Sequence, residues 1–458
     1  MTSQDLIYSW HDGLQQGQYF LQPYTSFTYN NRSMLISRET GTTLFLSVDT
    51  AEQLSNGIIN DRLRHHLIAN GFIEGPDKLP VQDYSNTIIP SFFLIDMTNR
   101  CNLNCAYCLR MPNDQEKSIT NEKVDEICAY ILQHCRHHHL KHITIQPWGG
   151  EPLLQLEQVL QIRRWFNKHP DLLVNITVET NGTLLTEAMI SELRKHHIAI
   201  SISFDGPPDL HDLQRRDWKG NSTSDRVAHG IELARKAGYD NLGGICVLTN
   251  HSLGRVFDIL VYAENVLKIK GVKLNLMHQP PYPCEGLRAL DSVEITHIAQ
   301  EIVNAVYAIR ARGSKLHESC TADRLQNLLY NSKGNICHSC GCCGGRRMVS
   351  FDMDGNVYPC ELTDWPDECL GNISDNRDLC EMVADAITTH SYFREKKESK
   401  CERCPWWFYC RGGCSSAMKY VNRYGNGIDK CECALNLTMY PLLTKLLLKD
   451  EYGAKGWL

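Results

Sequence analysis

The chain has 458 residues, of which 42% are apolar, so it can bury a large core and its length predicts two to four domains. A net charge of −6 gives no general electrostatic reason to bind nucleic acid or an anionic membrane. The sequence starts without a signal-peptide pattern and lacks an apolar run of about eighteen residues. We therefore expect a cytoplasmic protein whose 21 cysteines are reduced and bind metal.

Residues 1–88 are predicted to form a separate unit that ends in a polar, proline-containing linker at 75–85. Strand-like alternation occurs at 19–21, 27–29, 33–37 and 43–46, and helical patterns follow at 51–58 and 61–69. This order resembles the winged-helix-like module of enzymes that modify ribosomally made peptides, which binds an extended leader peptide on the edge of its sheet. A domain that merely covers one end of a barrel is the alternative.

Residues 89–288 alternate between strand and helix patterns. Strand character is found at 92–96, 142–146, 174–179, 198–204, 242–248 and 272–277. Strands separated by helices indicate a parallel sheet with crossovers, and this number fits a partial (β/α)6, TIM-like barrel of the α/β class. In such barrels the functional residues lie on the loops at the carboxyl ends of the strands.

Three cysteines follow the first predicted strand, at Cys101, Cys105 and Cys108. Cysteine thiolates bind iron–sulfur clusters, and three protein sulfurs leave one iron open for another ligand. A zinc site would need a fourth ligand that is missing at short spacing. The Cys-x3-Cys-x2-Cys pattern resembles the signature of radical S-adenosylmethionine (radical SAM) enzymes, whose [4Fe-4S] cluster binds the cofactor. We also assign Tyr107, within this loop, to the cofactor site.

A Trp-Gly-Gly-Glu-Pro segment follows the second predicted strand. Gly149 and Gly150 allow a close approach of the backbone to a ligand, and the carboxylate of Glu151 can accept hydrogen bonds from an ammonium group. The segment resembles the Gly-Gly-Glu-Pro motif of the radical SAM family. That resemblance implies that it binds the amino group of S-adenosylmethionine.

Polar side chains end the next two predicted strands, where ribose hydroxyls or a carboxylate need hydrogen-bond partners. These side chains are Glu179, Asn181, Ser203 and Asp205. The stretch from Ser203 onward resembles the Ser-x-Asp-Gly-Pro segment, followed by an arginine, of peptide and sulfatase maturases. The serine and arginine help to position the cofactor there. Either Arg215 or Arg216 can be that arginine, and a surface ion pair is the alternative for each.

Four histidines lie close together at positions 134, 137, 138 and 139. They suggest a metal site, but they fall at the polar end of a predicted helix. We interpret them as a solvated helix terminus.

Residues 289–458 begin with a predicted bridging helix at 292–312 and then contain most of the cysteines. Gly355 favours a hairpin turn before Cys360. The spacing resembles the SPASM extension of radical SAM enzymes, which implies two auxiliary [4Fe-4S] clusters. One set is Cys401, Cys404 and Cys410 with Cys431 or Cys433, and the other is Cys360 and Cys414 with two of Cys337, Cys340, Cys342 and Cys343.

Within the second set we prefer Cys337 and Cys343. The region has more thiols than the pattern requires, including Cys369 and Cys380, so some are bystanders. Two structural zinc sites are the alternative to the clusters.

These resemblances imply a radical SAM/SPASM enzyme that modifies a ribosomally made precursor peptide through its leader and forms a thioether or a carbon–carbon crosslink. Its cofactors would be S-adenosylmethionine and three [4Fe-4S] clusters, with an external one-electron reductant such as flavodoxin or ferredoxin. A formylglycine-generating anaerobic sulfatase maturase is one alternative, and a non-enzymatic metal-binding or electron-transfer scaffold is another. Sulfatase maturases have an aspartate base after the Gly-x4-Cys cysteine. Glu361 occupies that position here, and we predict it as the catalytic base, with a structural ion pair to a nearby cation as the alternative.

Overall fold

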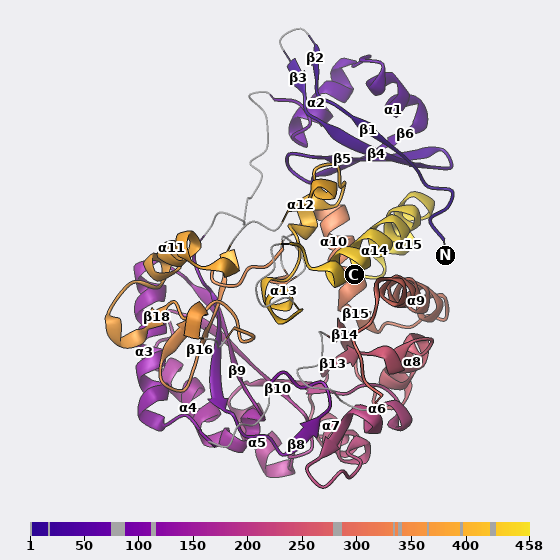
Figure 1. Cartoon of the computed structure of the whole chain (residues 1–458). Helices are drawn as coiled ribbons and strands as arrows, with labels where there is room; N and C mark the ends of the chain where they lie inside the picture. The colour runs from indigo at the N-terminus through magenta and orange to yellow at the C-terminus, as the bar shows by residue number, and fades with distance from the viewer. Residues whose placement is uncertain are drawn as a thin grey trace.

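The computed structural model has a large curved sheet with helices on its outer side and a smaller N-terminal sheet (Figure 1). The structure describes residues 2–16, 19–74, 88–110, 116–277, 286–332, 335–337, 341–363, 366–393, 397–421 and 427–458. The predicted linker at 75–85 and Cys340 lie outside the described residues. In the part of the chain that is described, no helix is both long and apolar enough to cross a membrane.

Six parallel, adjacent strands form the barrel, as predicted. In chain order they are β7 (Phe92–Thr98), β9 (His142–Gly149), β10 (Leu173–Thr180), β11 (Ala199–Ser203), β13 (Gly243–Leu248) and β14 (Gly271–Leu276). Alternate residues point to opposite faces of a strand, and the buried isoleucines of β11 face the helices while Ser201 and Ser203 face the barrel interior. The carboxyl ends of all six strands therefore meet at one end of the barrel.

Helices cover the outer face of this sheet (Figure 1). They are α3 (Asn121–His137), α4 (Leu156–Phe166), α5 (Glu187–Lys195), α6 (Pro208–Gln214), α7 (Ser224–Lys236) and α8 (Val256–Asn265). In α3, Val124, Ile127, Cys128, Ile131 and Cys135 recur at helical spacing and are buried, so one face packs on the sheet.

The helix predicted at 292–312 is confirmed as α9 (Ser292–Ala311). It starts at Asp291, whose side chain accepts hydrogen bonds from the backbone amides of Val293 and Glu294. The prediction made it a bridge to the next domain. It follows β14 and packs both against α8 of the barrel and against α14 of the C-terminal third.

Segments from the C-terminal third extend both edges of the barrel sheet. β15 (His317–Glu318) pairs with β14, and β16 (Met348–Phe351) pairs in parallel with β7. The hairpin from β16 to β17 (Asn356–Tyr358) confirms the predicted turn, with Gly355 at a φ of +83°, and β18 (Gly371–Asn372) follows. The hairpin brings Cys360 to the edge of the barrel next to the first strand.

The N-terminal unit has a four-stranded antiparallel sheet in the order β1 (Ile7–His11), β4 (Tyr24–Tyr29), β5 (Arg32–Ser37) and β6 (Thr43–Ser47). A hairpin of β2 (Leu14–Gln16) and β3 (Tyr19–Leu21) and the helices α1 (Val48–Ser55) and α2 (Asp61–Ala69) complete it. The predicted strands and helices are found. The sequence analysis missed β2 and β1, which is one of the two outer strands of the described sheet.

Aromatic stacking fastens the N-terminal unit to the C-terminal third. Phe27 of β4 stacks on Trp406 at 4.9 Å between ring centroids, and Trp406 stacks on Tyr440 at 5.0 Å. The hydroxyl of Tyr409 donates to the carbonyl of Gly41 at 2.6 Å. Helix α14 (Lys430–Lys449) contacts β4, β5 and α9, so it lies between the N-terminal sheet and the barrel (Figure 1). The C-terminal third of the chain also contains α10 (Ser319–Tyr330), α11 (Leu379–Thr389), α12 (Trp407–Cys410), α13 (Ser415–Val421) and α15 (Glu451–Lys455).

Candidate functional site

The three-cysteine loop follows β7 and is held by a segment that comes much later in the chain. Its strand β8 (Leu103–Cys105) pairs with β12 (Arg215–Asp217), so Cys105 lies opposite Arg215. Burial raises the pKa of Cys105 to about 12, the cation of Arg215 lowers it, and the thiols of Cys108 and Cys101 raise it further. The three thiols therefore lie near one another and near a buried cation.

The two glycines of the Gly-Gly-Glu segment bring the end of β9 against this loop. The backbone amide of Gly150 donates to the carbonyl of Thr98 at 2.7 Å, and that of Glu151 donates to the carbonyl of Arg100 at 2.9 Å. A Cβ at position 150 would lie 2.1 Å from the Arg100 oxygen, and Gly149 has a φ of +128°. We predicted that these glycines let the backbone approach a ligand closely. In the structure they let the backbone approach the cysteine loop.

The carboxylate of Glu151 ties the loop after β9 to the loop after β10. It accepts hydrogen bonds from the backbone amides of Leu153 (3.0 Å) and Asn181 (2.8 Å) and from the hydroxyl of Thr180 (2.8 Å). A carboxylate has about four acceptor positions, so about one remains for a ligand. The side-chain amide of Asn181 lies 4.0 Å from the sulfur of Cys101, which places Asn181 at the edge of the thiol group.

Tyr107, Asp205 and Arg215 form a buried network beside the thiols. The Tyr107 hydroxyl donates to Asp205 at 2.7 Å and accepts from Arg215 at 2.5 Å. The backbone amide of Val247 donates to the other oxygen of Asp205 at 3.1 Å. Nε of Arg215 is buried without a hydrogen-bond partner among the described residues, so the guanidinium has a donor left for a bound carboxylate.

The structure distinguishes the two candidate arginines. Arg215 is 7% exposed and faces Tyr107, whereas Arg216 is exposed and donates to the backbone carbonyl of Asp212 at 2.7 Å. Successive residues of β12 point to opposite sides, so only one can enter the site. The assignment of Arg216 to the cofactor site is therefore corrected, and Arg215 remains.

Charged side chains meet inside the barrel. Burial raises the pKa of Glu179 to about 6, with Lys273 lowering it and Glu361 raising it. Burial also acts to lower the pKa of Lys273, but the nearby Cys337, Glu179 and Glu361 raise it above its ordinary value. Ser203 is half-buried at the end of β11 on this interior side. The sequence analysis missed Lys273, although a lysine inside the apolar strand 272–277 is a signal for an inward-facing charge.

Arg110 connects the cysteine loop with the C-terminal third. Its guanidinium donates to Asp96 of β7 at 2.5 Å and to the backbone carbonyl of Glu361 at 3.1 Å. The thiol of Cys360 donates to the Glu361 carboxylate at 2.9 Å. Glu361 therefore lies between a C-terminal thiol and the interior of the barrel.

One group of C-terminal thiols surrounds Cys360. Burial raises the pKa of Cys360 well above its ordinary value, and Cys342 and Cys414 add to the shift after Glu361. Cys337 lies near Cys342 and Cys414, and Cys342 packs with Cys360 and Tyr392 in one apolar cluster. Neighbouring side chains in a non-helical segment point in different directions, so we revise the preference from Cys343 to Cys342.

The other group lies between α12 and the start of α14. Burial raises the pKa of Cys404 to about 11, and Cys433 and Cys401 raise it further. Cys433 also raises the pKa of Cys410, whereas burial, Asp429 and Glu432 raise the pKa of Cys431. Residues two apart on a helix point about 200° apart, so Cys433 faces the group and we prefer it to Cys431.

The donor sets suit clusters better than single ions. In the described part of the chain two groups of ligand atoms are close enough for one ion, and neither includes a cysteine of the three motifs. A single tetrahedral zinc, with bonds of about 2.3 Å, would draw its sulfurs together. In the first motif, three thiols can hold a [4Fe-4S] cluster with one open iron. Each C-terminal group provides four thiols, which can ligate all four irons of a cluster.

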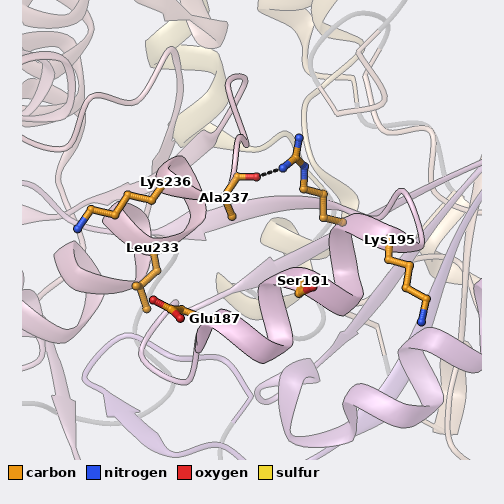
Figure 2. A pocket seen from close by; sticks show the side chains of 7 residues that line it. Glu187, Ser191, Lys195, Leu233, Lys236 and Ala237 are labelled. Carbon is orange, nitrogen blue, oxygen red and sulfur yellow. Dashed lines mark hydrogen bonds between the residues drawn. The ribbon is translucent and has the colours of Figure 1, made fainter.

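A separate cavity of about 490 Å3 lies on the outside of the barrel between α5 and α7 (Figure 2). It is lined by Glu187, Ser191, Arg194, Lys195, Leu233, Lys236 and Ala237. Arg194 donates to the carbonyl of Ala237 across it. None of these residues belongs to the candidate site, so this cavity is a groove between two helices.

Family models match two parts of the chain. Residues 95–262 match the radical SAM superfamily, and residues 342–405 match SPASM, an iron–sulfur cluster-binding domain. The chain is 25% identical over 334 residues to a cysteine-type anaerobic sulfatase-maturating enzyme of Clostridium perfringens, covering 71% of this chain and 88% of the relative. It is 21% identical over 373 residues to the radical SAM cyclopropyl synthase TigE of Paramaledivibacter caminithermalis, covering 78% and 73%.

Two solved structures share the fold. Native anSMEcpe with bound AdoMet superposes with a TM-score of 0.68 at 21% identity, covering 78% of this chain and 100% of that chain. Streptococcus suis SuiB bound to precursor peptide SuiA superposes with a TM-score of 0.53 at 14% identity, covering 87% and 96%.

The barrel, its three-thiol loop and the cysteine-rich C-terminal third define an iron–sulfur enzyme that binds S-adenosylmethionine. The chain is a radical SAM enzyme with a SPASM domain, related to the anaerobic sulfatase maturases. A [4Fe-4S] cluster, S-adenosylmethionine and auxiliary iron–sulfur clusters are its cofactors.

The revised ligand sets predict different iron contents for neighbouring cysteines. Cys342→Ser should lose roughly four iron atoms per chain, one cluster's worth, whereas Cys343→Ser should keep them. Likewise, Cys433→Ser should lose roughly four iron atoms per chain, whereas Cys431→Ser should keep them. Iron analysis of anaerobically reconstituted protein measures this. Equal iron loss within either pair would show that the assignment of that pair is wrong.

The two arginines predict a second matched comparison. Arg215→Gln removes the buried cation, so affinity for S-adenosylmethionine should fall by roughly tenfold or more, while Arg216→Gln should bind normally. Equilibrium dialysis under anaerobic conditions gives the affinities, and iron content controls for folding. Normal binding by an iron-replete Arg215→Gln variant would remove Arg215 from the cofactor site.

Proposed function

We propose that this radical SAM/SPASM enzyme modifies a ribosomally made precursor peptide, which its N-terminal unit binds by the leader. The observation that carries the proposal is the open edge of β1 on a unit packed next to the C-terminal thiols. Two comparisons support it. The radical SAM cyclopropyl synthase TigE is a relative. A structure of Streptococcus suis SuiB, which has also been solved with its precursor peptide SuiA, covers 91% of this chain, whereas anSMEcpe covers 78%.

The edge of β1 suits the addition of a peptide strand. β1 pairs with β4 on one side, and no described strand lies beyond it. An edge strand presents unpaired backbone groups, and an extended peptide can bind them by strand addition. Exposed apolar side chains lie on it and on the adjoining hairpin: Ile7 (67%), Tyr8 (64%), Leu14 (41%) and Phe20 (38%).

Cys101, Cys105 and Cys108 would hold the cluster that binds the cofactor, with Arg215 facing its carboxylate and Glu151 its amino group. Asn181, Ser203, Asp205 and Glu179 would line the rest of the cofactor site. When bound and reduced by an external donor such as flavodoxin or ferredoxin, the cluster and S-adenosylmethionine supply the 5'-deoxyadenosyl radical that removes hydrogen from carbon. The C-terminal third, which extends both edges of the barrel sheet, would help to exclude water from this chemistry.

Glu361 would accept a proton from the substrate. Its carboxylate lies beside Cys360 and near Lys273 and Glu179, inside the barrel. An ionised carboxylate is the form of a glutamate side chain that takes a proton. A substrate thiol that loses its proton there could form a thioether with a neighbouring carbon from which the 5'-deoxyadenosyl radical has removed hydrogen, and an auxiliary iron–sulfur cluster would take the one electron that remains. A carbon–carbon crosslink is the other product that we propose.

A formylglycine-generating sulfatase maturase is the second candidate. The Clostridium perfringens relative is named as a cysteine-type anaerobic sulfatase-maturating enzyme, and the match to this chain covers 88% of its length. Glu361 in place of the aspartate base and the added N-terminal unit both favour the peptide-crosslinking proposal.

Glu361→Gln keeps the shape of the side chain but removes its basicity. Peptide modification should slow by roughly a hundredfold or more, while 5'-deoxyadenosine formation without peptide stays unchanged. Chromatography of both products measures this, with the exposed Glu381→Gln as the control. Full peptide modification by Glu361→Gln would dispose of the base assignment.

The edge of β1 can be blocked without deleting the N-terminal unit. Ile7→Lys with Tyr8→Lys should weaken precursor-peptide binding about tenfold or more, because two apolar contacts are lost and charge is placed on the edge. Val293→Lys, on the exposed side of α9, is the matched control. Peptide affinity is measured by fluorescence anisotropy. If the double variant binds as tightly as the control, leader binding lies elsewhere.

A further inference from the structure

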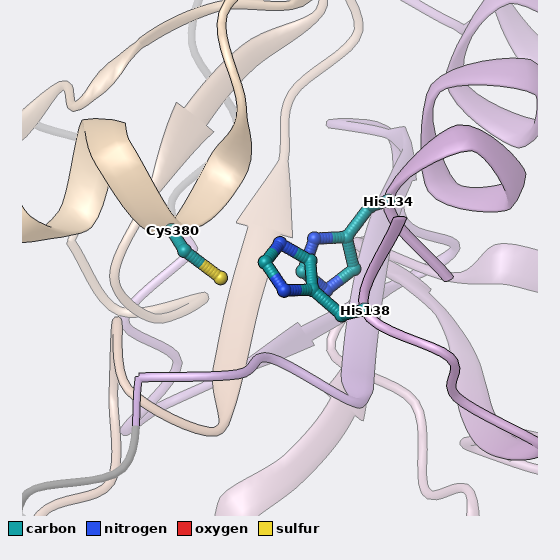
Figure 3. Close-up of side chains that lie close together, drawn as sticks. All are labelled: His134, His138 and Cys380. Atoms are coloured by element: carbon teal, nitrogen blue, oxygen red, sulfur yellow. The ribbon is translucent and has the colours of Figure 1, made fainter. Parts of the chain in front are cut away.

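Three metal-ligand side chains meet where the barrel joins the C-terminal third. His134 is in the last turn of α3, His138 caps that helix, and Cys380 is in the first turn of α11. Their ligand atoms lie within 4.8 Å of one another, and Figure 3 shows the side chains turned toward one another. The interpretation of the histidines as a solvated terminus suits the exposed His137 and His139 but not His134, which is 3% exposed.

The ring of His134 presents a nitrogen prepared for a ligand. Its Nε2 lies 2.9 Å from the carbonyl of Pro90, which can only accept a hydrogen bond, so Nε2 carries the proton and Nδ1 carries the lone pair. Nδ1 is buried and has no hydrogen-bond partner among the described residues. Burial lowers the pKa of His134 to about 4, which keeps the ring neutral, as metal binding requires. Histidine ligands commonly donate their other nitrogen to a backbone carbonyl in this way.

Asp378 holds the other two side chains in place. It accepts a hydrogen bond from Nε2 of His138 at 3.0 Å and from the backbone amide of Cys380 at 2.9 Å. His137, His138 and Asp378 form a second group, which shares only His138 with the first, so Asp378 acts here by orienting His138 and Cys380. Two imidazoles and one sulfur match the ligand types that zinc prefers.

We propose that His134, His138 and Cys380 bind a zinc ion that joins α3 of the barrel to α11 of the C-terminal third. Binding releases the thiol proton of Cys380 to solvent, and the thiolate and Asp378 then balance the charge of Zn2+. The two elements already contact each other, because the hydroxyl of Tyr130 in α3 lies 3.7 Å from the sulfur of Met382 in α11 and donates to the carbonyl of Arg377, just before α11, at 2.9 Å. The ion crosslinks this interface, whichever substrate the enzyme uses.

The test separates this zinc from the iron–sulfur sites by matched variants. Wild type, His138→Gln, Cys380→Ser and the exposed control His139→Asn are reconstituted anaerobically with iron and sulfide, incubated with one equivalent of ZnCl2 and desalted. Elemental analysis then gives zinc and iron per chain. Asparagine is chosen because position 139 has a φ of +55°, which asparagine tolerates.

Wild type and His139→Asn should retain about one zinc per chain, and the other two variants less than about a tenth of that, with equal iron in all four. Zinc should also raise the melting temperature of wild type but not of Cys380→Ser. Equal zinc in all four proteins, or no zinc retained by wild type, would overturn the proposal.

Discussion

The contact between two backbones at Gly150 is the constraint on which the candidate site depends. The cysteine loop after β7 has little regular structure, and it is shaped by hydrogen bonds from the amides of Gly150 and Glu151 to Thr98 and Arg100. A side chain at position 150 would collide with the Arg100 carbonyl. The pairing of Cys105 with Arg215 holds the other side of the loop. Segments that follow β9 and β11 therefore position the thiols of the loop that follows β7.

The C-terminal third completes this arrangement. Its strands extend both edges of the barrel sheet, and Arg110 links Asp96 of the first strand to the backbone of Glu361. Thiol groups carry negative charge when they ligate iron, and the buried Arg215 and Lys273 place compensating cations beside them. The stacked Phe27 and Trp406 connect the N-terminal sheet to the same region. Peptide binding, radical formation and proton transfer are thus proposed for three units that pack as one body around the thiols.

Local patterns were sufficient to predict the six barrel strands, the helix at Ser292–Ala311 and the hairpin at Gly355, because each depends on nearby residues. Choices that depend on distant pairing were not predictable. Arg215 is selected over Arg216 by the register of β12 against β8, and Cys342 over Cys343 by packing on Cys360. His134 was misjudged because Cys380 and Pro90, which give its ring a role, are far away in the sequence.

The most direct measurement of the central claim follows a hydrogen atom from peptide to cofactor. A fully deuterated candidate precursor peptide from the same genome is incubated anaerobically with the reduced enzyme and S-adenosylmethionine, and the 5'-deoxyadenosine is analysed by mass spectrometry. The account predicts one deuterium per 5'-deoxyadenosine formed in coupled turnover, together with a peptide that has lost mass at the modified residues. Deuterium-free 5'-deoxyadenosine and an unchanged peptide would contradict it.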